Sequence, residues 1–150
     1  MIELEIKIQE YPSEDGEKIA ELFSNIYAFT EISHSDKNPL GTITHTATAQ
    51  GLDCLRFFYE QARKQRTVEA IRQYLLYLLE DQDGPREVFF LIHKQALTQK
   101  KLVICKEPEE SPLGPVIVTI KSEELYVLIN YLFPPTEAGK VIEATRLPTK

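Results

Sequence analysis

The chain has 150 residues, of which 43% are hydrophobic and 27% charged, and this balance excludes a disordered or fibrous protein. A chain of this length can bury a core of its own, so we expect a single domain over residues 1–150. The net charge of −6 argues against indiscriminate binding to nucleic acid, because that affinity comes from neutralising phosphates.

The amino terminus, residues 1–10, alternates apolar and charged residues, which predicts a half-buried strand over residues 2–8. It lacks the uninterrupted apolar stretch of a signal peptide, and no window approaches the roughly 18 apolar residues of a membrane span. We therefore expect a cytoplasmic protein that has no membrane partner.

A helix and a second strand follow. Pro12 and Ser13 set the predicted helix start, and acidic residues come next, where the helix dipole favours negative charge. Residues 31–41 read as an irregular connection. Residues 42–50 alternate threonine with Ile43 and other less polar residues, which is typical of a strand.

From Leu52 the apolar period lengthens to that of a helix. The phase of the apolar stripe changes near residues 64–67, so the pattern predicts two successive helices, the second capped by Thr67. Gly84 and Pro85 end the second helix.

Three apolar runs come next, over residues 87–94, 100–106 and 114–120. They are apolar at both alternating positions, which predicts interior strands covered on both faces. A last amphipathic helix follows, with Ser122 as its predicted cap and Pro134 beyond its end.

These elements predict an α+β fold: a single mixed, largely antiparallel sheet of about five strands with helices packed on it. Residues 136–150 have little pattern, and we expect a loosely ordered tail there. Cys54 and Cys105 are far apart in the sequence, which indicates neither a disulfide nor a zinc site, and we expect two reduced, buried thiols.

No catalytic constellation is visible. His34, His45 and His93 lie in no nucleophile signature, and no metalloprotease, paired-cysteine or phosphate-loop motif occurs, so we expect neither an enzyme nor a cofactor. His45 lies on the inward side of a predicted strand, which favours a hydrogen-bonded core histidine. The acidic loop over residues 107–110 favours a solvated turn over a cation site, because one loop rarely supplies enough oxygen ligands.

The basic residues are unevenly spread. Residues 54–106 hold ten Lys/Arg against six Asp/Glu, a net +4, which leaves −10 on the rest of the chain. Two clusters stand out, one at a helix end over residues 63–72 and one at a predicted strand-to-strand turn over residues 94–101. Each also has a purely structural explanation, because cations stabilise helix ends and protect strand edges. If both clusters share one face, they form a stripe that can hold a phosphate backbone.

Four blocks lie in the stretch from about Leu55 to Ile142, in the order KQRTVEAIRQYLL, FLIHKQAL, ESPLGPVIVTI and LINYLFPPTEAGKVI. In these blocks the chain resembles a conserved, uncharacterised family of small archaeal proteins predicted to bind RNA. The resemblance implies a fold like that of ribosomal protein L-five, no enzyme activity and no cofactor. The basic and amide positions of that family match Lys64, Gln65, Arg66, Arg72, Lys94, Gln95 and Lys101.

Our leading hypothesis is a non-enzymatic protein that contacts the backbone of structured RNA and recognises its shape more than its sequence. The candidate nucleic-acid-binding residues are Arg63, Lys64, Gln65, Arg66, Arg72, Lys94, Gln95, Lys100 and Lys101. The alternative is a protein-interaction or self-assembly module, in which strand edges or the aromatic face of Tyr74 and Tyr77 meet a second copy to form a homo-oligomer.

Overall fold

A computed structural model of the protein describes residues 1–149. Its main sheet has six strands: β1 (Ile2–Glu10), β2 (Ile32–His34), β3 (Ile43–Gln50), β4 (Glu87–Ile92), β5 (Ile104–Cys105) and β6 (Val116–Ser122). The strand order is β2-β3-β1-β6-β4-β5, and each neighbouring pair is antiparallel. The predicted α+β fold with a largely antiparallel sheet is confirmed, with six strands in place of about five.

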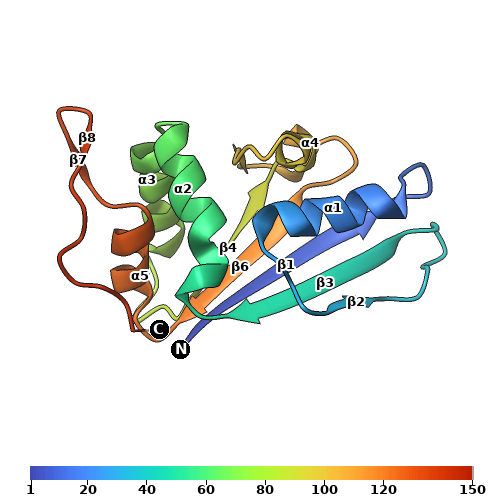
Figure 1. The fold of residues 1–150 in the computed structure, drawn as a ribbon, viewed down its shortest axis with the longest axis horizontal. Helices are drawn as coiled ribbons and strands as arrows, with labels where there is room; N and C mark the ends of the chain where they lie inside the picture. Colours follow the sequence, from blue (N-terminus) through green and yellow to red (C-terminus); the bar gives the residue numbers. More distant parts are fainter. Residues whose placement is uncertain (150) are drawn as a thin grey trace.

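The helices cover one side of this sheet (Figure 1). They are α1 (Gly16–Ile26), η1 (Leu52–Leu55), α2 (Arg56–Lys64), α3 (Val68–Leu79), α4 (Lys94–Thr98), η2 (Pro108–Glu110) and α5 (Leu125–Leu132), where η marks a 3-10 helix. In Figure 1, α2, α3 and α5 gather at one end of the sheet, while α1 and α4 lie together over the other end. A small hairpin, β7 (Thr136–Glu137) and β8 (Lys140–Val141), extends beyond the helical end.

Alternation along the strands explains why only one side is covered. In β1 the apolar residues at even positions are fully buried beneath the helices, and the polar residues between them lie on the opposite face. On that opposite face the Phe89 side chain of β4 is 65% exposed. The prediction that the last three strands are covered on both faces is therefore wrong, because the sheet is antiparallel and one of its faces meets water.

Three elements differ from the sequence prediction. The connection over residues 31–41 contains β2, a three-residue edge strand too short to show an alternation. The run over residues 87–94 leaves the sheet after Ile92, because the Nδ1 atom of His93 accepts a hydrogen bond from the N–H of Ala96 at 3.1 Å and starts α4. The cluster over residues 94–101 is consequently a short helix and its end, and only β5 is strand in the run 100–106.

The predicted break between two helices near residues 64–67 is confirmed. Thr67 is the residue before α3, although its side chain makes no capping bond to that helix. At the last helix Ser122 still belongs to β6, and its hydroxyl accepts a bond from the N–H of Glu124 at 3.0 Å, just before α5 begins.

The carboxyl-terminal segment contacts the rest of the molecule. Residues 136–149 include the β7–β8 hairpin, and Pro148 is buried. Lys150, the last residue of the expected tail, lies outside the described residues. Within residues 1–149, no helix combines the length and the apolar character needed to cross a membrane.

Both cysteines are buried free thiols, as predicted. Cys54 lies in η1, where its thiol donates to the carbonyl oxygen of Gly51 at 2.9 Å. Burial raises the pKa of the Cys54 thiol to about 11, so this thiol remains protonated and unreactive at neutral pH.

Candidate nucleic-acid interface

Gln65 joins the two basic segments that the sequence singled out. Its Nε2 atom donates to the carbonyl oxygen of Leu102, and its Oε1 atom accepts from the N–H of Leu102, both at 2.8 Å. One side-chain amide thus bonds both the backbone N–H and the carbonyl oxygen of Leu102, a residue next to the sheet edge. As a result the end of α2 and the segment after α4 lie side by side.

Both helices end in the same way at this place. Arg66 follows α2 with φ 58°, and Lys100 follows α4 with φ 59°, so each occupies the left-handed position that usually holds glycine after a helix. The next residue closes each helix with a backbone bond to the carbonyl five residues before it: Thr67 to Ala62 at 2.9 Å and Lys101 to Ala96 at 3.0 Å. The left-handed conformation costs an L-residue about 1 kcal/mol, and here two cations hold it.

Four cations at these helix ends are free to bind an external anion. Lys64, Arg66, Lys100 and Lys101 are exposed, and within residues 1–149 none of them forms an ion pair. Lys100 borders a hollow of about 410 Å³ together with Gln61, which lies one turn before Lys64 on α2. We call these four residues the cationic junction. Asp53 and Glu60 line the same hollow as Lys100 without forming an ion pair with it, and exposed cations of this kind attract anions.

Gln95, another predicted site residue, is also exposed. It is the second residue of α4, which has five residues, and Lys100 lies two residues beyond the end of that helix.

Two of the predicted arginines have a structural role at the end of α5. The Nη1 atom of Arg63 donates to the carbonyl oxygen of Leu132 at 2.9 Å, and its Nη2 atom donates to that of Tyr131 at 3.3 Å. Arg72 donates to the carbonyl oxygen of Phe133 at 3.0 Å. These are the last carbonyls of α5, which have no partners within the helix. Arg63 and Arg72 are therefore helix caps.

The remaining contacts of Arg63 hold it firmly in that position. Its guanidinium carbon lies 3.5 Å from the centroid of the Tyr59 ring, and its Nη2 atom pairs with Glu143 at 2.7 Å. The Arg63 side chain is only 19% exposed, so little of it can reach a phosphate. The same applies to the amide of Gln65, which is fully used by Leu102.

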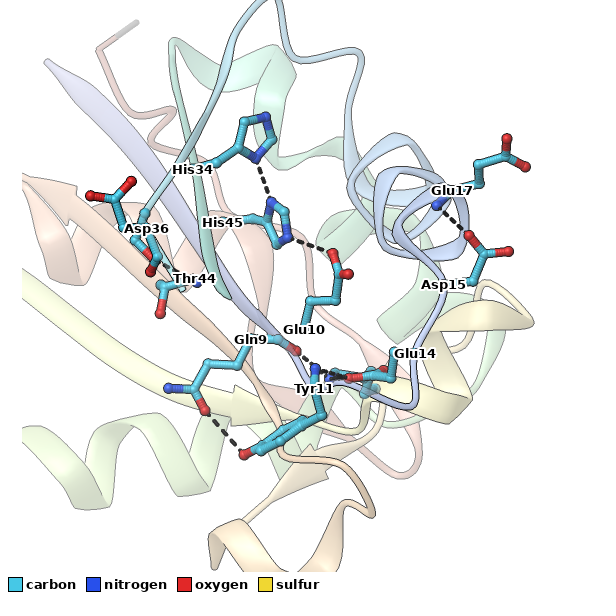
Figure 2. Close-up of polar contacts among 12 residues, drawn as sticks. Gln9, Glu10, Tyr11, Glu14, Asp15, Glu17, His34, Asp36, Thr44 and His45 are labelled. Carbon is cyan, nitrogen blue, oxygen red and sulfur yellow. Dashed lines mark hydrogen bonds and ion pairs between the residues drawn. The ribbon is translucent and has the colours of Figure 1, made fainter. Parts of the chain in front are cut away.

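The Lys94 side chain is buried in the protein. The residue is 3% exposed, and its Nζ atom donates to the carbonyl oxygens of Gln9 and Leu113, both at 2.6 Å, and to the carboxylate of Glu14 at 3.0 Å. Figure 2 shows the Gln9, Tyr11 and Glu14 side of this network. The prediction that Lys94 contacts RNA is wrong, because all three of its donors are satisfied inside the protein.

A groove of about 770 Å³ lies beside the cationic junction, between α3 and residues 102–106. Tyr74 and Tyr77 line it from α3, and Val103 and Ile104 line it from the sheet edge. Gln65 and Leu102, which tie the junction together, are also part of its lining. Tyr77 is 65% exposed, and burial raises the pKa of the Tyr74 hydroxyl. The groove is thus mainly apolar and aromatic, with Lys106 in its lining and the carboxylates of Glu107 and Glu110 acting on Tyr74.

Proteins of known sequence resemble this chain over nearly its whole length. A UPF0201 protein of Sulfurisphaera tokodaii is 28% identical over 149 residues, which are 99% of this chain and 99% of the relative. A UPF0201 protein of Metallosphaera sedula is 31% identical over 138 residues, 91% of each chain. The chain belongs to the UPF0201 family. The resemblance to an archaeal family is confirmed to this extent, while no family model matches the sequence.

The fold of this UPF0201 chain agrees with that of a solved relative. A crystal structure of a UPF0201 protein from Methanococcus jannaschii superposes with a TM-score of 0.72 at 21% sequence identity. The match covers 94% of this chain and 99% of that chain. The antiparallel sheet with helices is therefore the UPF0201 architecture.

Two histidines of the UPF0201 chain lie together on β2 and β3, at the opposite edge of the sheet from β5. His45 is 8% exposed, and its Nε2 atom lies 2.9 Å from Oε1 of Glu10 (Figure 2). Its Nδ1 atom lies 2.5 Å from Nδ1 of His34 on the edge strand β2. His45 is thus a hydrogen-bonded core histidine, as predicted. Among residues 1–149, no group of three or more His, Cys, Asp or Glu side chains could hold a metal ion.

Proposed function

We propose that this UPF0201 protein is a non-enzymatic, cytoplasmic RNA-associated protein that contacts the phosphate backbone through the cationic junction. The supporting observation is that Arg66 and Lys100 hold left-handed backbone conformations at adjoining helix ends, where glycine would be less strained. Backbone strain that persists in the folded state is more frequent at functional sites than elsewhere.

The composition of the junction suits a phosphate ligand. Lys64 and Lys101 flank the two strained positions, so four basic residues belong to two helix ends that Gln65 and Leu102 hold side by side. Cations near a helix end also stabilise the helix dipole, and this role leaves their exposed charges accessible to a phosphate. Contacts of this kind position an RNA without reading its sequence. A fold like that of ribosomal protein L-five is part of the proposal, supported by the antiparallel sheet with helices on one side.

The test is a titration of the protein with a structured RNA at several salt concentrations. We expect the logarithm of the affinity to fall linearly with the logarithm of the salt concentration. In the variant Arg66→Gly/Lys100→Gly the affinity should fall and the slope should become shallower by about two. Its free energy of unfolding should change by less than about 1 kcal/mol, because glycine removes backbone strain as well as a cation.

The matched control removes the same charge elsewhere. Lys18→Gln/Lys37→Gln changes two exposed lysines, one in the first turn of α1 and one in the β2–β3 connection. This control should retain the wild-type affinity and slope. If it weakens binding as much as the glycine variant does, the junction is not the site. If the wild-type protein binds no RNA at low ionic strength, the proposed function is wrong.

A second candidate function is self-assembly through the open face of the sheet. Phe89 is 65% exposed there, with the half-buried side chains of Leu91 and Ile117 beside it. Glu5 and Lys7 of β1 supply both signs of charge on the same face, which a two-fold contact between copies needs. Light scattering at several concentrations tests this candidate function. A wild-type dimer that becomes monomeric in the variant Phe89→Ser supports self-assembly, and a wild-type monomer at every concentration contradicts it.

A further inference from the structure

We propose that the groove between α3 and the sheet edge receives an unpaired base of the RNA whose backbone lies on the cationic junction. This inference rests on the proposed function and makes its ligand more specific. It predicts that the preferred RNA has a single-stranded loop or bulge next to a structured region.

The groove adjoins the junction at Arg66 and Lys101. Gln65 and Thr67 line the groove, and Arg66 lies between them in the sequence. Leu102 lines it as well and directly follows Lys101. Arg66 and Lys101 are therefore chain neighbours of residues that line the groove, so a phosphate held by these two cations brings the attached base close to the groove.

The lining suits a flat aromatic ligand. Tyr77 is exposed and Tyr74 half-buried, both on one side of α3, and Val103 and Ile104 face them from the sheet. Unpaired bases of RNA stack on such aromatic side chains, and every base offers a π-face for this contact. Lys106 lies at the groove with its Nζ atom 5.9 Å from the centroid of the Tyr74 ring, which adds a positive charge for a neighbouring phosphate.

An added peptide strand fits the groove poorly, although β5 is an edge strand. The carbonyl oxygen of Val103 points toward the sheet and accepts from the N–H of His93. The peptide groups of the alternate residues, Leu102, Ile104 and Lys106, therefore point away from the sheet, where an added strand would bind. The outward groups of Leu102 are both bound by Gln65. The outward N–H of Lys106 donates to Oε2 of Glu110 at 3.1 Å. The peptide groups on both sides of Ile104 are thus already hydrogen-bonded, and too few remain to pair with an added strand.

The experiment compares three RNAs: a hairpin with a single-stranded loop, the same hairpin with abasic loop nucleotides, and a blunt duplex of equal charge. Tyr77→Ala should lower the affinity for the first hairpin by about tenfold, a typical loss for one stacked base. The salt slope should not change, because no phosphate contact is removed. The affinity of Tyr77→Ala for the abasic hairpin and for the duplex should equal that of the wild-type protein.

Two variants serve as controls. Tyr77→Phe keeps the ring and should retain the affinity for the looped hairpin. Tyr126→Ala removes an exposed tyrosine of α5, which is 47% exposed and lies outside the groove lining, and should leave the affinity unchanged.

Failure of this inference differs from failure of the proposed function. The groove holds no base if the wild-type protein binds the looped, abasic and duplex RNAs with equal affinity and Tyr77→Ala has the same affinities. The proposed contact with the phosphate backbone is retained in that case. If Tyr77→Ala dissociates a dimer without changing RNA affinity, the groove is a contact between copies, which also overturns the inference. If no RNA binds at low salt, the proposed function fails and the inference with it.

Discussion

At the scale of single residues, Lys94 and Lys100 begin and follow the same short helix, and their environments are opposite. Lys94 is 3% exposed and bound to Glu14 and two carbonyl oxygens, whereas Lys100 is exposed without an ion pair among residues 1–149. Burial lowers the pKa of Lys94, and the contact with Glu14 opposes that change. One lysine stabilises the fold, and the other is available for a ligand.

Replacing Lys94 should therefore destabilise the protein without a direct effect on its affinity for RNA. Lys94→Met leaves the Glu14 carboxylate, only 11% exposed, without its cation, and the free energy of unfolding should fall by about 3–5 kcal/mol. Urea denaturation measures the change, and Lys101→Met serves as a control that should stay within about 0.5 kcal/mol. A loss below about 1 kcal/mol for Lys94→Met would contradict this account of the network.

The sequence could not separate these two lysines. The partners of Lys94 come from the loop after β1, from the end of β1 and from the turn before β6, all far away in the chain. Spacing within residues 94–101 carries no information about those contacts. The four cations of the junction were among the candidates, and the structure removes Arg63, Arg72 and Lys94 from the accessible set because each has internal partners.

At the scale of elements, the helix pair α2–α3 was predictable and α4 was not. The change of apolar phase near residues 64–67 appears within a window of several turns, which is what periodicity needs. The five residues of α4 complete little more than one turn, so no period exists to detect, and a histidine acts as its cap. The same limit hides β2, which has three residues.

The capping of α5 by arginine gives a prediction at this scale. Arg63→Met removes charged hydrogen bonds to Tyr131 and Leu132, and the free energy of unfolding should fall by about 1.5–3 kcal/mol. Thermal unfolding measures the loss. Arg56→Met is the matched control, because that side chain is 68% exposed and, among residues 1–149, pairs only with Asp53, and it should cost less than about 0.5 kcal/mol.

The same variant tests the assignment of the site. At a temperature where Arg63→Met is folded, its RNA affinity and salt slope should equal those of the wild-type protein. A slope shallower by about one would return Arg63 to the RNA contacts.

At the scale of the whole molecule, stability should fall in alkaline solution. The pKa of Cys54 rises from 9.0 to about 11 on folding, so between these pH values the folded chain binds more protons than the unfolded chain. The contribution is fully present below pH 9 and is lost as pH rises through about 11, a decrease of about 2–3 kcal/mol. Urea denaturation at a series of pH values measures it.

Cys54→Ala isolates the thiol from the tyrosines and lysines that titrate in the same range. The variant should show a shallower loss of stability between pH 9 and 11 than the wild-type protein does. Equal slopes for the two proteins would show that the thiol is not the group responsible.

Gln65 gives the molecule a point of coordinated motion. Two hydrogen bonds, both from one amide, hold the end of α2 to the segment that leads into β5. Because both bonds come from one amide, rotation of the Gln65 side chain away from Leu102 removes them together. Gln65 also lines the groove, so the proposed base site and the proposed phosphate contacts depend on the same side chain.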